Sequence, residues 1–153
     1  MKKSNEYEKL IAQCEAYVAE KKPSCNNPAM AARVVAPLVF GKAQEAFYML
    51  PLDAMHKLIK APIMVTLGVG NSAPVGVKEV FRYAILSGAE SIIVAHNHPS
   101  GDVHPSSADV ETTRTLVDAG KLIGIKVLDH VIIGNKTEQD GNWFYSMREA
   151  GII

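Results

Sequence analysis

The stretch from residue 91 to residue 109 constrains the fold more than any other part of the chain. It contains, in order, the apolar run SIIVA, two histidines separated by one residue, a loop rich in proline and glycine, and the start of a helix. A fully apolar short run is typical of a buried strand, and strand side chains alternate, so His96 and His98 can point the same way from its end. The segment PSGDVHP turns the chain back, so the helix expected over Ser107–Ile123 begins beside the histidines.

Three side chains of this unit form a candidate metal site. Ser106 and Asp109 lie three residues apart at the helix start, and Asp109 falls in the first turn, facing back toward the strand end. Two neutral imidazoles and one carboxylate suit zinc, and three protein ligands leave the fourth tetrahedral position open for water. We therefore predict one mononuclear zinc site, formed by His96, His98 and Asp109, that activates a water molecule.

Each part of this pattern also has a simpler explanation. A serine followed three residues later by an aspartate is typical of an ordinary helix start, because serine accepts free amide protons and aspartate complements the helix dipole. A histidine pair of this spacing does not by itself indicate a metal. The metal interpretation depends on the coincidence, since the pair, the loop and the acid that faces back have one joint explanation.

Composition limits the remaining possibilities. A chain of 153 residues with 48% hydrophobic content can form one domain with a core, but not two of ordinary size. Sixteen basic and sixteen acidic residues cancel, so nucleic-acid binding is not supported by charge and would have to come through partners. Cys14 and Cys25 have no zinc-knuckle or disulfide spacing. No signal peptide or membrane-length apolar run is present, so we expect a cytoplasmic protein without a membrane partner.

Hydrophobic spacing predicts two helices before the first strand. An amphipathic helix is expected over residues 5–22, with Asn5 and Glu8 as its cap. A second helix is expected over Ala29–Val39, capped by Asn27 and ended at a glycine.

The rest of the chain mixes strands and helices. EAFYMLPLD and LIKAPIMVTLGV are predicted to pair as antiparallel strands, and Val77–Ser87 to form a helix. IKVLDHVIIG is a strong late strand, and an edge strand is expected around residues 143–145. This order favours a mixed α/β or α+β fold over a regular doubly wound sheet.

The polar motif also carries a family resemblance. HNHPSGDVHPSSAD fits HxHx7SxxD and resembles the JAMM (MPN/JAB) metalloprotease superfamily, and HNHPSGD, PSSAD and LDHVIIG are similar to its RadC-like branch. The likeness covers residues 27–153, which we take as the RadC-like domain, and leaves residues 1–26 as an N-terminal helix and linker. It implies a single mixed α/β domain with a JAB/MPN-like, cytidine-deaminase-like sheet flanked by helices.

The resemblance also implies roles for individual residues. The two histidines and the aspartate coincide with the family's ligands for one zinc ion per chain, and Ser106 with a serine that hydrogen-bonds the reacting oxygen. The family uses a glutamate as base at the end of the helix before the first core strand, and Glu45 in AQEAFYMLPLD holds that place. Glu79 in VKEVFRYA is the competing candidate; we favour Glu45. The implied activity is hydrolysis of a peptide, isopeptide or related amide bond in a peptide or protein substrate.

The sequence departs from the RadC-like pattern in two places. It lacks the N-terminal helix-hairpin-helix portion of long members, and it has VGVKE where the branch has a His-Pro-Arg-Glu-like stretch before Glu79. Two rival functions remain. An HNH nuclease would spread its three residues over a ββα unit, and the balanced charge argues against it. The second rival is a RadC-like, DNA-repair-associated or non-catalytic interaction module. A non-catalytic member would be expected to lose ligands, and this chain keeps all three.

Several other residues have weaker claims to function. His104 falls between the matched positions of the loop and is expected to be solvated. Asp129 and His130 alternate along a strand, so at most one faces the site, and support of a zinc imidazole and a purely structural pair both stay open. GVGNSA, residues 68–73, superficially resembles a dinucleotide loop, but Pro74 interrupts the required helix.

Overall fold

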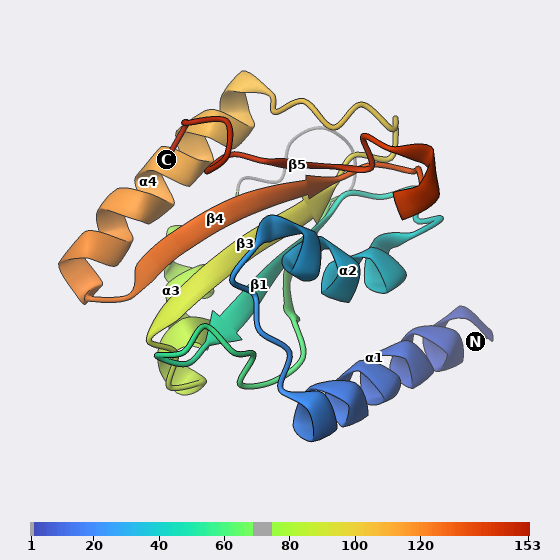
Figure 1. Cartoon of the computed structure of the whole chain (residues 1–153), viewed down its shortest axis with the longest axis horizontal. Coiled ribbons are helices and arrows are strands. Elements are labelled where there is room, and N and C mark those ends of the chain that lie inside the picture. Colours follow the sequence, from blue (N-terminus) through green and yellow to red (C-terminus); the bar gives the residue numbers. More distant parts are fainter. Residues whose placement is uncertain (1, 69–74) are drawn as a thin grey trace.

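A mixed five-stranded sheet forms the centre of the computed structural model, which describes residues 2–68 and 75–153. Of the segment that superficially resembles a dinucleotide loop, residues 68–73, only Gly68 belongs to the described residues. Helices and a mixed sheet together form one domain, which confirms the predicted mixed α/β class. In chain order (Figure 1), its elements are α1 (Lys2–Lys21), α2 (Pro28–Val39), β1 (Ala46–Leu52), β2 (Ile63–Leu67), α3 (Val77–Leu86), β3 (Ser91–Asn97), α4 (Ser107–Ile123), β4 (Lys126–Ile133), a 3-10 turn (Glu138–Asp140) and β5 (Phe144–Ser146).

The strand order explains which ends of the strands and helices lie close together. The order is β2-β1-β3-β4-β5, with β3 and β4 parallel and the other neighbours antiparallel. The predicted antiparallel pair is therefore confirmed as β1 and β2, and the predicted edge strand as β5. Parallel neighbours need a crossover connection, and α4 supplies it between β3 and β4. The start of α4 thus returns beside the carboxyl end of β3.

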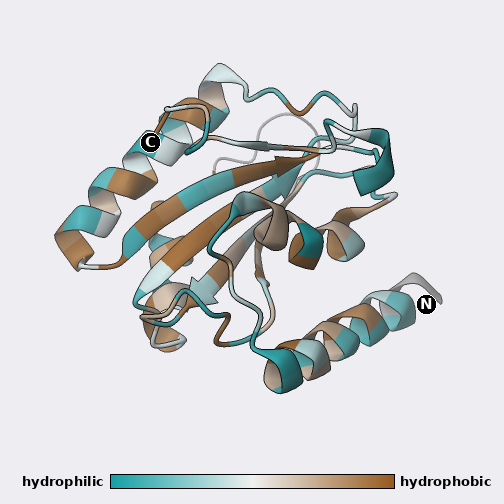
Figure 2. Ribbon diagram, viewed as in Figure 1, coloured by the Kyte–Doolittle hydropathy of each residue, from teal (hydrophilic) through white to brown (hydrophobic). Residues whose placement is uncertain are grey.

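Helices cover both faces of the sheet. One apolar cluster joins α1 and α2 to side chains such as Tyr48 and Ile93, and the other joins α3 and α4 to side chains such as Met49 and Val94. Figure 1 shows α2 in front of the sheet and α3 behind it. All seven residues of β1 and of β3 are buried, and most of β3 is hydrophobic in Figure 2. These two strands lie between the two clusters, which explains their almost continuous apolar sequence.

Helix α1 begins earlier than the sequence suggests. It already includes Lys2, so Asn5 and Glu8 lie inside the helix and the prediction that they cap it is wrong. The Tyr7 hydroxyl lies 3.1 Å from the Tyr48 hydroxyl and ties the helix to β1. Among the described residues, none of the helices combines the length and the apolar character that a membrane crossing requires.

The other helix starts agree with the sequence. The Asn27 side chain accepts a hydrogen bond of 3.0 Å from the Met30 amide, which confirms the predicted cap of α2. Helix α4 has the predicted bounds and ends at Gly124, whose φ of 82° is a conformation that glycine adopts without steric cost. Strand β3 runs on to Asn97. His96 therefore belongs to the strand and His98 follows it directly.

Candidate metal centre

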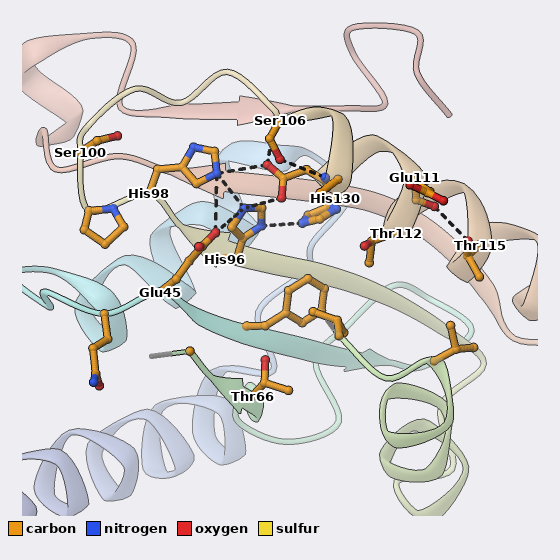
Figure 3. Close-up of a pocket in the computed structure, with 18 of the residues that line it drawn as sticks. Glu45, Thr66, His96, His98, Ser100, Ser106, Glu111, Thr112, Thr115 and His130 are labelled. Carbon is orange, nitrogen blue, oxygen red and sulfur yellow. Dashed lines mark hydrogen bonds and ion pairs between the residues drawn. The ribbon is translucent and has the colours of Figure 1, made fainter. Parts of the chain in front are cut away.

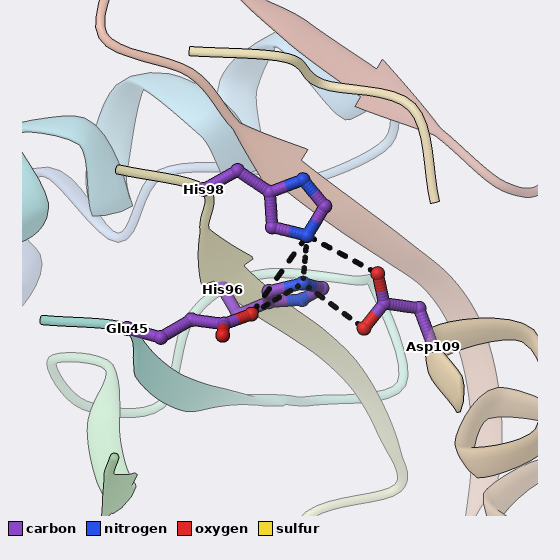
Figure 4. A group of neighbouring side chains, drawn as sticks. All are labelled: Glu45, His96, His98 and Asp109. Atoms are coloured by element: carbon purple, nitrogen blue, oxygen red, sulfur yellow. Dashed lines mark hydrogen bonds and ion pairs between the residues drawn. The ribbon is translucent and has the colours of Figure 1, made fainter. Parts of the chain in front are cut away.

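Four side chains converge at the carboxyl end of β3 (Figure 4). Among the described residues, one donor atom each from Glu45, His96, His98 and Asp109 lies within 4.8 Å of the others. The histidines come from the end of β3 and the aspartate from the first turn of α4. The glutamate precedes β1, and it arrives here because Phe47 of β1 pairs with His96 of β3 in the antiparallel register.

The spacing of these atoms fits a metal ion. A tetrahedral zinc ion with bonds of about 2.0–2.1 Å places its ligand atoms about 3.3 Å apart. His96 Nε2 lies 2.9 Å from His98 Nε2, 3.3 Å from Asp109 Oδ1 and 3.3 Å from Glu45 Oε1. His98 Nε2 lies 3.1 Å from Asp109 Oδ2 and 3.7 Å from Glu45 Oε1. Two imidazole nitrogens with carboxylate oxygens also form a donor set that suits a divalent transition metal.

The remaining nitrogen of each imidazole has a partner of its own. His98 Nδ1 lies 2.7 Å from the Asp102 carbonyl oxygen, which can only accept. His98 therefore carries a proton on Nδ1, and its Nε2 faces the other ligands. His96 Nδ1 lies 2.7 Å from Nε2 of His130. Both rings are thus held from behind, as is usual for metal-binding histidines.

Charge interactions within the cluster are strong. Burial would raise the pKa of the Asp109 carboxyl, but the neighbouring His96 and His98 outweigh burial and hold that pKa well below its usual range. The hydrogen bond to Asp109 is the main cause that raises the pKa of His98. In the metal-free chain a proton on His98 Nε2 therefore lies in the position that suits a cation, and a metal ion would displace it.

The cluster lies in a cavity of about 1110 Å³ (Figure 3). Phe47 stacks against the His96 ring, with the ring centroids 5.9 Å apart. A bulge in the pairing of β2 with β1 places Thr66 opposite Phe47, and both side chains line the cavity. The described lining includes the acids Glu45, Asp109 and Glu111 but no lysine or arginine. The described lining therefore offers no lysine or arginine to pair with a phosphate group.

Ser106 and Asp109 form the helix cap that the simpler explanation predicts. The Ser106 hydroxyl oxygen accepts from the Asp109 amide at 3.1 Å, and Asp109 Oδ2 accepts from the Ser106 amide at 2.8 Å. This cap does not compete with the metal interpretation, because Asp109 Oδ1 still faces His96. The Ser106 side chain lines the cavity, and its hydroxyl proton is not used by the cap.

The structure separates the two candidate bases. Glu45 lies beside both histidines, whereas Glu79 lies in the first turn of α3, folded back over Gly76, and is not part of the cluster. Proximity therefore favours Glu45, and its catalytic role stays a prediction. His104 is 77% exposed in its side chain and bonds Asp102, as expected for a solvated loop residue.

His130 and Asp129 point in different directions. His130 is fully buried and reaches His96, and burial lowers its pKa well below the usual value. Asp129 accepts hydrogen bonds from the Ser146 hydroxyl at 2.6 Å and the Arg148 amide at 3.0 Å, away from the ligands. Of the two, His130 contacts the candidate ligands and Asp129 has a structural environment.

Asn97 is a residue that sequence reasoning missed. Its Oδ1 accepts from the Ala46 amide at 2.7 Å, and its Nδ2 donates to the Gln44 carbonyl at 3.1 Å. It therefore holds the peptide groups on both sides of Glu45. The signal was present in the sequence, because the middle residue of His-Asn-His points away from both histidines, and a buried asparagine needs hydrogen-bond partners.

Comparison with known proteins agrees with these features. The model of the RadC-like JAB domain family matches residues 25–152. A UPF0758 protein of Methanosarcina mazei is 35% identical over 144 residues, covering 94% of this chain and 60% of the relative. A UPF0758 protein of Cyanothece sp. is 41% identical over 125 residues, covering 82% of this chain and 49% of the relative. The chain thus spans about half to three fifths of these curated relatives. The chain belongs to the RadC-like JAB domain (UPF0758) family, a part of the JAMM/MPN superfamily.

Proposed function

We propose that this chain is a zinc-dependent hydrolase that cleaves a peptide, isopeptide or related amide bond. The observation that carries the proposal is the convergence of Glu45, His96, His98 and Asp109 inside one cavity. The two histidines and the aspartate would hold the ion. The glutamate is then left as the acid–base group, because it is the most exposed of the four, at 37% of its side chain.

The bound ion would supply Lewis acidity and a lowered pKa, near 7, for water beside it. Glu45 Oε1 lies 3.3 Å from His96 Nε2, so its carboxylate borders the place where a water molecule would sit. From there the carboxylate accepts a proton from water and returns one to the departing amine. The exposure of Glu45 gives both the water and the amine access to it.

Ser106 has a free proton to offer at the same place. Its hydroxyl oxygen already accepts from the Asp109 amide, and this contact fixes the oxygen without using the hydrogen. The hydroxyl therefore donates to the oxygen of the scissile carbonyl as negative charge develops there. A comparable donor in other hydrolases changes kcat by roughly 10²–10³-fold.

The lining of the cavity favours an amide substrate over a nucleic acid. Phosphodiesters are bound by lysine, arginine and helix amides, and the described lining contains no lysine or arginine. A neutral extended peptide imposes no such requirement. The balanced net charge of the whole chain favours the same conclusion.

Metal analysis beside an activity screen tests the proposal. Wild-type protein purified without chelators should contain one zinc per chain by mass spectrometry, and Asp109→Ala should contain none. Asp118→Ala is the matched control, because Asp118 lies on α4 but is exposed and paired with Lys121. A metal-free wild type would refute the site. Stoichiometric zinc without hydrolysis of peptide and isopeptide libraries would refute the activity.

A further inference from the structure

A buried histidine behind the site has no part in the reaction proposed above. His130 of β4 has 0% exposure, and both of its ring nitrogens are engaged. Its Nε2 lies 2.7 Å from His96 Nδ1, and its Nδ1 lies 2.5 Å from Thr113 Oγ1 of α4. Figure 3 shows the His130 ring beside His96, on the side away from the Glu45 carboxylate. A buried polar chain of this kind needs one donor and one acceptor at each contact.

The contact between Thr113 and Asp109 fixes which group donates and which accepts in this row of hydrogen bonds. Thr113 Oγ1 lies 2.6 Å from the main-chain carbonyl oxygen of Asp109, one helical turn earlier. A carbonyl only accepts, so the single hydroxyl proton of Thr113 points to Asp109. Met147 Sδ, 3.2 Å from the same hydroxyl, is a weak acceptor and does not displace the carbonyl. Thr113 must therefore accept from His130, whose proton lies on Nδ1.

The same order of donors and acceptors determines which nitrogen of His96 carries the proton. With its proton on Nδ1, a neutral His130 offers a lone pair on Nε2, and His96 Nδ1–H donates to it. His96 Nε2 is left with its lone pair, facing His98 and Asp109. The reverse direction would leave the two oxygens of the Thr113–Asp109 contact without a proton between them. It would also put a proton on His96 Nε2, the atom that must bind a metal.

We propose that His130 and Thr113 are positioning residues that hold His96 in its metal-binding tautomer. This inference rests on the metal site of the proposed function. The row of hydrogen bonds begins at the Asp109 carbonyl and ends at the His96 ring, so it links two candidate ligands on the side away from the metal position. Thr113 and Asp109 share α4, so the packing of α4 against β4 sets both the carboxylate position and the proton position on His96.

The first test is made without metal. In the metal-free protein, long-range 15N–1H NMR spectra of the imidazole rings should place the protons of His96 and His130 on Nδ1. A proton on Nε2 of either ring overturns the proposal, whether or not the protein binds zinc. This result is therefore independent of the metal analysis that decides the proposed function.

The second test removes the Thr113 hydroxyl from the row of hydrogen bonds. Thr113→Val keeps the side-chain shape but lacks the hydroxyl, so His96 should partly shift its proton to Nε2, and zinc affinity measured by chelator competition should fall roughly 10–100-fold. Thr113→Ser should restore both. The control is Thr115→Val, because the Thr115 hydroxyl makes the same kind of bond to the Glu111 carbonyl, at 3.0 Å, without reaching a histidine.

The variants also separate positioning from simple loss of stability. Thermal unfolding of each variant shows how much the fold itself is affected, whereas the tautomer of His96 reports only on the hydrogen-bond chain. If Thr113→Val keeps the wild-type tautomer and zinc affinity, the proposal is wrong. Should that variant not fold, the tautomer measured in the wild type still decides the question.

Discussion

The two halves of the candidate metal centre are built in different ways. His96, His98 and Asp109 come from one strand–loop–helix unit, and their side chains are 3%, 16% and 16% exposed. Glu45 comes from the residue before β1, is 37% exposed, and reaches the histidines through the pairing of β1 with β3. The half expected to hold a metal is thus buried and local in sequence. The half expected to move a proton is more open and depends on the tertiary fold.

Breaking the local half should have the largest effect. His96→Ala removes a ligand nitrogen from the centre of the cluster, so zinc content should fall from one per chain to none, and hydrolysis should disappear with it. Elemental analysis after gel filtration measures the loss. His104→Ala, which changes an exposed histidine of the same loop, should keep the metal. Retention of full zinc by His96→Ala would show that the ligands are misassigned.

Changing the distant half should separate binding from turnover. Glu45→Gln keeps the size of the side chain but removes its basicity, so zinc content should stay near one per chain while kcat falls by about 10²–10⁴-fold. Glu79→Gln is the control and should have wild-type kcat, because Glu79 lies on α3 outside the cluster. An active Glu45→Gln beside an inactive Glu79→Gln would reverse the assignment of the base.

Ser106 tests a residue that has a structural and a proposed catalytic role. Ser106→Ala should lower kcat by roughly 10²–10³-fold through loss of the donor. It should also lower the free energy of unfolding by about 1 kcal/mol, because the cap of α4 is lost. Urea unfolding measures the second effect separately. Ser107→Ala is the control, because Ser107 neither caps α4 nor is proposed to contact the substrate. Similar kinetics for the two variants would exclude a catalytic role for Ser106.

Asn97 should give the smallest effect on kcat and the most selective one. Asn97→Ala releases the peptide groups on both sides of Glu45, and a displacement of about 1 Å can lower kcat by up to about 10²-fold. The buried Ala46 amide loses its acceptor, at a cost of about 1–3 kcal/mol in unfolding free energy. Zinc content should not change. Loss of zinc together with kcat would show that Asn97 supports the histidines instead.

The same contrast explains what the sequence could predict. The positions of the two histidines and of Asp109 follow from local rules, namely alternation along a strand, a Pro/Gly loop and a helix cap. The bounds of α2 and α4 follow from similar rules and agree with the structure to within one residue. The cap of α1 was wrong because the helix continues upstream of Asn5, and cap residue types are also common inside helices.

Features that depend on sheet order could not be derived locally. Hydrophobic patterning identifies β1 and β3 as strands but does not say that they are neighbours, so the choice between Glu45 and Glu79 depended on the family resemblance. His130 was left open for the same reason, because its role depends on the parallel pairing of β3 with β4, which places it opposite Val94 and beside His96.

The reciprocal hydrogen bonds between Ser106 and Asp109 also determine when this ligand becomes ordered. The carboxylate is anchored to the helix backbone as α4 forms, so its conformational entropy is lost on folding and not on metal capture. An arriving ion finds the carboxylate already oriented, so it has only to lose its own water and displace the proton on His98 Nε2. Metal uptake should therefore be governed by the dehydration of the ion and by pH, with little rearrangement of the helix.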